Sequence, residues 1–379
     1  MNGNEGLATF SDVAYATTAG IYLVALVISL VYYGMLRSAT DARRERARIL
    51  GESKAKADTA SKVSVGAGAG AAGASDTVDT GDTIDDIDEK DAADDGSHDV
   101  SGIATGSMSE EDLPKNFQVE TLRKKFRRTD QWGGMAQMVV WLGVAVHFLF
   151  LVTRGIAAER FPWGNLFEYV TVITGVSMLV ACVLLRRPSM RVVWPWLLVP
   201  NMMMMFYAGT ELYSDVQPLV PSLNSYWYWI HVSTVSIGGS IGLVSGVASL
   251  MYLFRRSQPK GKEKGFFGAI ATPLPDASKL DALAYRTAIW TLPIFGLGVI
   301  FGAIWAHFAW GRIWGWDPKE TVSLITWLLY AAYLHARATP GMRGKPAAWI
   351  NVVAFATMVF NLFFINIVVS GLHSYAGLN

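Results

Sequence analysis

The sequence is almost without cysteine: Cys182 is the single one among 379 residues. One cysteine excludes an internal disulfide, a CxxC redox pair and an iron–sulfur cluster held by this chain alone. Any thiol chemistry in which the protein takes part must therefore use the thiols of a partner. The net charge is also small, at +1, because acidic residues in one insert balance basic residues at the ends of apolar runs. This balance indicates no nucleic-acid partner.

Long apolar runs are what the sequence has in abundance, since 52% of its residues are hydrophobic despite a long polar insert. Eight of these runs are near the length that a helix needs to cross a bilayer. They cover approximately residues 19–35, 132–152, 166–185, 192–208, 229–254, 286–308, 321–336 and 349–369. We therefore expect an all-α polytopic membrane protein with about eight transmembrane helices, in contact with membrane lipids.

The distribution of basic residues predicts which side of the membrane each loop occupies. Lys and Arg cluster after the first run, between the third and fourth, after the fifth and after the seventh. By the positive-inside rule these segments are cytoplasmic, so both termini lie outside. We expect a multi-pass protein of the bacterial cytoplasmic membrane. Arg154 and Arg160 are exceptions in an outer loop, where they could serve an anionic ligand.

Three domains follow from these shifts in composition. Residues 1–40 form an N-terminal transmembrane helix, residues 41–130 a cytoplasmic linker, and residues 131–379 a seven-helix membrane domain. The linker passes through a Gly/Ala stretch into an acidic run without aromatic residues, so we expect it to be largely disordered. His98 lies within it and is expected to be solvated.

The stretch 305–320, WAHFAWGRIWGWDPKE, stands out from every other loop. It places four tryptophans, two glycines, a histidine and two carboxylates in sixteen positions on the outer side. An interfacial aromatic belt explains isolated tryptophans elsewhere, but it explains three indoles in one short loop poorly. The pattern favours a flat aromatic surface for a large planar ligand, and haem is the expected ligand.

Five histidines outside the linker are candidate haem ligands, because imidazole is a common axial ligand of haem iron. His231, His307 and His373 lie at outer helix ends near the tryptophans. His335 lies near the cytoplasmic end of the seventh run, and His147 lies within the second. Each could instead be a solvated or hydrogen-bonded side chain, and for His147 a contact between helices is a plausible role.

Two further patterns have structural explanations. Asp317, Pro318 and Glu320 fit the N-cap, N1 and N3 positions of a capping box for the seventh helix. Such a cap would fix the direction in which the chain leaves the tryptophan-rich loop. The fifth run carries glycines at four-residue spacing, at positions 238, 242 and 246, which favours close helix packing.

Residues 310–337, WGRIWGWDPKETVSLITWLLYAAYLHAR, closely resemble the tryptophan-rich WWD signature of the CcsA/ResC family, called CcsB in some bacteria. These are the haem-handling proteins of System II cytochrome c biogenesis. The resemblance extends to FPWGNLFEY at 161–169 and NLFFINIVVSGLHSYAG at 361–377, and it covers essentially residues 132–379. The first helix and the acidic linker lie outside it.

The resemblance implies a membrane subunit of a holocytochrome c synthase, or haem lyase, complex. Such a subunit presents haem b at the outer face, where the haem is joined through thioethers to the CxxCH cysteines of apocytochrome c. It implies a ResB-type partner and a thioredoxin-like thiol reductant. The residues that match the family's functional positions are the external ligands His231 and His373, the membrane ligand His335, and Trp310, Trp314, Trp316 and Asp317 of the WWD signature. His307 departs from the family pattern as a possible competing ligand.

Three other functions remain open at this point. A transporter of haem or another small molecule would lack the ligase role, and inverted repeats would favour it, but none is evident. A respiratory b-type cytochrome would place paired histidines deep in the bundle. A membrane scaffold would leave the tryptophan-rich loop unexplained.

Overall fold

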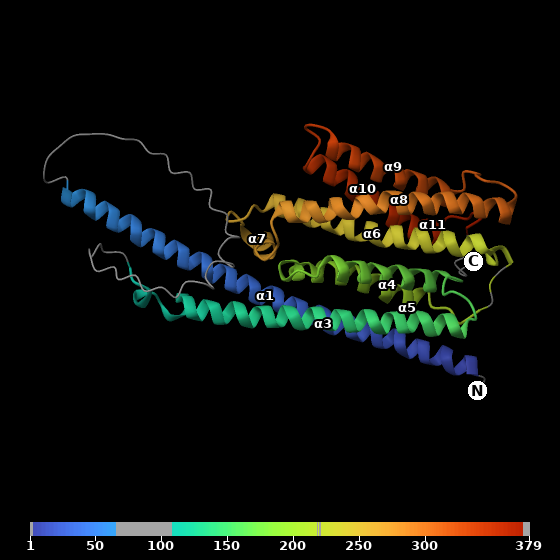
Figure 1. Cartoon of the computed structure of the whole chain (residues 1–379), viewed down its shortest axis with the longest axis horizontal. Helices are drawn as coiled ribbons and strands as arrows, with labels where there is room; N and C mark the ends of the chain where they lie inside the picture. Colours follow the sequence, from blue (N-terminus) through green and yellow to red (C-terminus); the bar gives the residue numbers. More distant parts are fainter. Residues whose placement is uncertain (1–2, 66–107, 218, 220, 374–379) are drawn as a thin grey trace, which may run out of the picture. The chain divides into compact units, whose positions relative to one another are not determined.

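The computed structural model describes residues 3–65, 108–217, 219 and 221–373, and within them the secondary structure is entirely helical. Figure 1 shows the arrangement of the helices. The chain divides into two compact units, residues 1–40 with 126–379 and residues 41–125, and each is described by itself. The α-helices are α1 (Gly3–Val65), α3 (Val119–Ala157), α4 (Leu166–Leu184), α5 (Trp194–Glu211), α6 (Tyr226–Ser257), α7 (Gly265–Ala271), α8 (Ala277–Trp310), α9 (Pro318–Ala338), α10 (Lys345–Leu362) and α11 (Phe364–Ile367).

The expectation of an all-α polytopic membrane protein is confirmed. Seven helical segments of the described chain are long and apolar enough to cross a membrane. The expected span at 321–336 forms helix α9, which is not among these seven. Its 21 residues include Lys319 and Glu320 in the first turn and Arg337 in the last, and these charges lower its hydropathy.

The helices extend further into the expected linker than the composition suggested. Helix α1 continues without a break to Val65, and α3 begins at Val119, well before its apolar run. Within the second unit, Arg46 forms an ion pair with Glu110 at 2.8 Å. Both ends of the expected linker are therefore helical, whereas residues 66–107, which include His98, lie outside the described residues.

Tyrosines of α1 pack against glycines of other helices in the first unit. A Cβ added to Gly143 of α3 would clash with the ring of Tyr22, and one added to Gly133 would lie 2.8 Å from the ring of Tyr32. The hydroxyl of Tyr15 donates a hydrogen bond to the carbonyl of Met205 in α5. Because glycine lets these rings approach the helix backbones, the first helix is an integral part of the bundle.

Helix α6 is the central helix, packed against α4, α8 and α10. Its three glycines at four-residue spacing allow neighbouring helices to pack closely, as the spacing predicts. Gly238 faces the backbone of Phe295 in α8, whereas Gly246 faces the ring of Phe355 in α10. Helix α9 in turn packs on α8 and α10, and all four of these helices contribute residues to the cavity described below.

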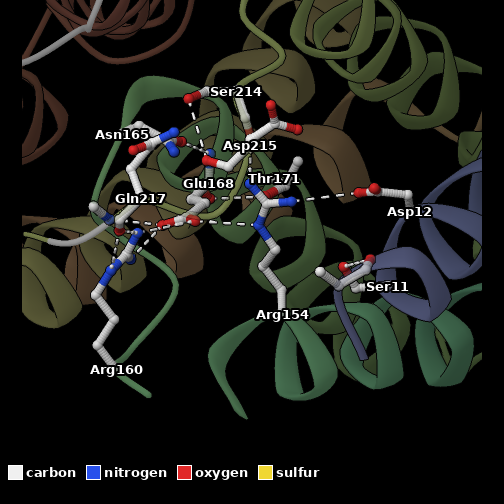
Figure 2. Close-up of polar contacts among 12 residues, drawn as sticks. Ser11, Asp12, Arg154, Arg160, Asn165, Glu168, Thr171, Ser214, Asp215 and Gln217 are labelled. Atoms are coloured by element: carbon white, nitrogen blue, oxygen red, sulfur yellow. Dashed lines mark hydrogen bonds and ion pairs between the residues drawn. The ribbon is translucent and has the colours of Figure 1, made fainter. Parts of the chain in front are cut away.

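A largely buried ionic cluster joins α1, α3 and α4 with the loop before α4 and the segment after α5 (Figure 2). The Glu168 carboxylate, which is fully buried, accepts hydrogen bonds from Arg154 at 3.2 Å and from Arg160 at 2.6 Å. Arg154 also pairs with Asp12 of α1 at 3.3 Å. The backbone N–H of Gly164 donates to the same carboxylate at 2.7 Å.

This cluster fixes the loop that precedes α4. Asn165 caps the helix by accepting a hydrogen bond from the backbone N–H of Glu168 at 2.8 Å, so the loop is held from both directions. Arg154 and Arg160, which we considered as sites for an anionic ligand, are instead paired with carboxylates of this chain. Their role in the structure is to position the loop.

We predict that Gly238→Ala destabilises the protein by about 1–3 kcal/mol, the usual cost of overpacking a well-packed core. The new Cβ would lie 2.8 Å from the backbone nitrogen of Phe295, which a side-chain rotation cannot relieve. Thermal unfolding in detergent measures the effect. Gly34→Ala in α1 is the control, because nothing lies within 4 Å of its added Cβ. Equal melting temperatures for the two variants would contradict the prediction.

We also predict that Glu168→Gln costs about 3–5 kcal/mol, because it leaves two buried guanidinium groups without their shared carboxylate. The exposed Glu159 lies in the same loop between α3 and α4, and Glu159→Gln is the matched control, with an expected change within about 0.5 kcal/mol. Thermal unfolding of both variants measures the difference. A Glu168→Gln protein as stable as the control would show that the cluster contributes little.

Candidate functional site

The candidate site is a cavity of about 170 Å³ lined by residues of α4, α6, α8, α9, α10 and the segments that connect them. Most of its wall is apolar, with Ile173, Val235, Phe295, Val299 and Met358 among the lining residues. Two histidines that the sequence singled out, His231 and His373, also line it. Residues from distant parts of the chain therefore meet around one space.

His231 lies in the second turn of α6 and is held against α8. Its Nδ1 is 2.8 Å from the carbonyl oxygen of Gly298, so Nδ1 carries the hydrogen in a neutral ring. Gly302 makes this approach possible, because a Cβ there would lie 2.7 Å from Cε1 of the imidazole. No hydrogen bond to Nε2 of His231 occurs within the described part of the chain, and a ring fixed in this way can ligate a metal through Nε2.

His373 follows α11 and is held by the first turn of α9. Its Nδ1 lies 2.8 Å from Oδ2 of Asp317, and Oδ1 of Asp317 accepts the backbone N–H of Leu372 at 2.9 Å. Burial lowers the pKa of His373 below its ordinary value, and the hydrogen bond to Asp317 only partly offsets this effect. The imidazole is therefore neutral at pH 7, which is the form that ligates metals.

Asp317 itself is ionised. Burial raises the pKa of its carboxyl group, but hydrogen bonds from His373 and from the Leu372 backbone outweigh burial and hold the pKa below its usual range. The predicted capping box is confirmed: Asp317 is the N-cap of α9, Pro318 opens the helix, and Glu320 accepts the N–H of Asp317 at 3.2 Å. One carboxylate thus starts a helix and orients a histidine.

Trp305 lies between the two histidines. Its ring stacks on that of His231 with centroids 5.9 Å apart and planes 15° apart, and it meets His373 edge to face, also at 5.9 Å. Trp310 contacts His373 from another direction, at 5.0 Å, and packs against Trp305 at 4.9 Å. The two imidazoles and two indoles form one continuous aromatic cluster.

The tryptophan-rich stretch is part helix and part loop, which differs from our expectation of a loop over 305–320. Helix α8 continues through Trp305 to Trp310 and ends at Gly311, whose φ of 68° is the left-handed conformation that favours glycine. In the loop that follows, Trp314 lines the cavity, whereas the Trp316 side chain is 68% exposed. Their rings are perpendicular and 5.8 Å apart.

The other three histidines outside the linker do not line the cavity. His335 is exposed in the last turn of α9, at the end opposite Asp317. His307 is exposed near the end of α8 and contacts Phe308. His147 is buried in α3, where its Nδ1 lies 3.4 Å from the Tyr22 hydroxyl. Of the five histidines outside the linker, the structure brings His231 and His373 together.

Several cavity residues were not identified from the sequence as site residues. Trp305 belongs to the tryptophan-rich stretch 305–320, but it was not proposed as a site residue. Its position near the end of an apolar run, close to His307, is the signal that could have identified it. Trp163 and Asn165 belong to the FPWGNLFEY segment, but only the fold brings that segment to the cavity. Lys319 also lines the cavity, and the capping pattern around it gave no sign of this.

Residues 163–373 match the model of the protein family described as cytochrome C assembly protein. Three relatives are named cytochrome c biogenesis protein CcsA. The protein of Guillardia theta is 33% identical, over 61% of this chain and 82% of the relative. That of Chlamydomonas reinhardtii is 33% identical, over 61% of this chain and 65% of the relative. That of Parasynechococcus marenigrum strain WH8102 is 31% identical, over 64% of this chain and 86% of the relative.

The matched region includes the segment that precedes α4, the tryptophan-rich stretch and both cavity histidines. It also covers more than half of the chain, so the resemblance is not confined to one motif. This chain is a multi-pass membrane protein that belongs to the cytochrome c assembly protein family, with the CcsA proteins among its relatives.

Proposed function

We propose that this protein takes part in cytochrome c biogenesis by holding haem b, as a substrate, at the outer face of the bacterial cytoplasmic membrane. The observation that carries the proposal is the pair His231 and His373. They stand on separate elements, line one cavity, and are each oriented by a hydrogen bond at Nδ1. Two imidazoles supported in this way suit axial ligation of haem iron.

The surroundings of the histidines also suit a tetrapyrrole. The cavity wall is largely apolar, and indole rings of Trp305 and Trp314 line it. Exclusion of water favours the uncharged macrocycle, and indole faces can pack on it. The imidazole of His231 is held by a backbone carbonyl and that of His373 by Asp317. Haem binding would therefore cost little side-chain entropy at these two ligands.

Thioether formation does not require a nucleophile from this chain. The cysteine thiols of a CxxCH apocytochrome are the nucleophiles, and they add to the vinyl groups of haem. We propose that this protein contributes positioning as a subunit of a haem lyase complex, with a ResB-type partner. Cys182 is buried in α4, so a separate thioredoxin-like protein would keep the substrate thiols reduced.

His335 has a separate role in this proposal. It is exposed in the last turn of α9, where another chain can reach it. We propose that it ligates haem before the haem reaches the outer cavity, with the opposite ligand supplied by the ResB-type partner. The excess of Lys and Arg in the segments expected to be cytoplasmic supports the orientation in which the cavity faces outwards.

We predict that His231→Ala and His373→Ala each abolish the absorbance spectrum of reduced bis-imidazole haem in the detergent-purified protein. His307→Ala is the control. His307 lies in the last turn of α8, close in sequence to Trp305, but it does not line the cavity. Spectra are recorded before and after dithionite, with and without the ResB-type partner. Unchanged spectra in both cavity variants would overturn the proposal.

Asp317→Asn provides a finer test of the ligand orientation. Asparagine is as good an N-cap as aspartate, so α9 still begins at its normal position. The neutral amide is a weaker acceptor for the His373 ring, and haem affinity should fall about 10- to 100-fold, as when other groups that orient a metal-ligating histidine are replaced. Haem titration of the purified variant measures the change. Wild-type affinity would show that Asp317 serves the helix alone.

A further inference from the structure

The cavity has one polar wall among its apolar ones. This wall is built from the first turns of α9, the end of α10, helix α11 and the loop before α4. The polar residues that line it are Asn165, Lys319, Glu320, Ser323, Asn361 and Asn366. A cavity with one polar wall and an apolar remainder fits a ligand that is itself apolar over most of its surface and polar at one edge.

Lys319 is the cation of this wall. Its Nζ donates a hydrogen bond to Oδ1 of Asn366, and it lies 5.8 Å from the ring centroid of Tyr169. Among the ion pairs found in the described residues, none involves Lys319. A partly buried ammonium group has three donors, and the side-chain amide of Asn366 uses one of them. The contacts therefore leave its charge without a counter-ion at bonding distance.

The two neighbouring carboxylates are engaged elsewhere. Asp317 accepts from His373 and from the backbone of Leu372. Glu320 pairs with Arg312 at 3.0 Å and accepts the N–H of Gly315 at 2.9 Å. Neither can turn towards Lys319 without giving up its own hydrogen bonds. A charge that lacks a paired partner in a membrane protein is costly, and such residues usually serve function.

Other donors of the cavity-lining residues also lack acceptors. Nε1 of Trp163 and Nδ2 of Asn165 are buried and have no hydrogen-bond partner among the described residues. Oδ1 of Asn361 is an acceptor in the same situation. Two of these three atoms are donors, and the ammonium group of Lys319 has further N–H groups beyond the one that Asn366 accepts. Buried polar groups are normally paired, so this excess predicts an acceptor supplied from outside the chain, preferably an anionic one.

We infer that the wall around Lys319 binds a carboxylate group of the ligand that enters the cavity. This inference rests on the proposed function, and for haem the carboxylates are the two propionates, which lie on the edge of the ring away from the vinyl groups. A propionate held at Lys319 fixes the rotation of the ring about its iron. It thereby determines which edge is offered to the apocytochrome thiols.

The test compares two ligands and two proteins. Wild-type protein and Lys319→Gln are titrated with haem and with haem dimethyl ester, whose propionates are uncharged. Wild-type protein should prefer haem over the ester roughly 10- to 100-fold, the value of a charge-assisted hydrogen bond. Lys319→Gln should lose most of this preference while it still binds the ester. Lys319→Arg should keep it, because the charge is retained.

Lys345→Gln is the matched control, because Lys345 is exposed in the first turn of α10 and does not line the cavity. Its preference for haem should equal that of the wild type. Equal affinity of wild-type protein for haem and the ester would overturn the inference even if Lys319→Gln fails to fold. Equal weakening of both ligands by Lys319→Gln would also overturn it. Wild-type protein that binds neither ligand would instead refute the proposed function, and the inference with it.

Discussion

The carboxylate of Asp317 is the interaction on which the geometry of the site depends most. It caps α9, accepts the backbone N–H of Leu372 and holds Nδ1 of His373. Because these three contacts come from one group, the tryptophan-rich loop, the start of α9 and the segment after α11 take their places together. Gly371 is required by this arrangement, since a Cβ there would lie 2.7 Å from Oδ1 of Asp317.

The orientation of the other histidine, His231, depends on helix packing and not on a carboxylate. The ring of His231 reaches α8 because Gly302 leaves room for it, and Gly298 lets the backbone of Val235 in α6 come close. The carbonyl of Gly298 then accepts the Nδ1 hydrogen of His231. Gly238, about two turns after His231 in α6, brings the same two helices close at Phe295. The two ligands proposed for haem are therefore fixed by different physics, one by a helix cap and the other by small residues that allow backbones to approach.

The sequence predicted most helices because apolar length decides where a membrane helix forms. The capping box at Asp317 could also be predicted, because it is a local sequence pattern. The pair of histidines was proposed from the resemblance to the family. It did not predict that α1 extends to Val65, since a polar helix beyond an apolar run carries no hydropathy signal. Nor could it pair Arg154 and Arg160 with Glu168 and Asp12, because those contacts exist only once α1, α3 and α4 have assembled.

The contrast between the Glu168 cluster and Lys319 separates a structural charge from one available to a ligand. In the cluster, two guanidinium groups meet two carboxylates, and backbone groups of Gly164 and Ser214 complete the hydrogen bonding. Such a set compensates its own desolvation and needs nothing from outside. Lys319 is surrounded by an amide, a tyrosine ring and carboxylates already in use. An ammonium group kept in that state gains most from a ligand that brings its own negative charge, so the polar wall favours amphipathic carboxylates over wholly apolar molecules of the same shape.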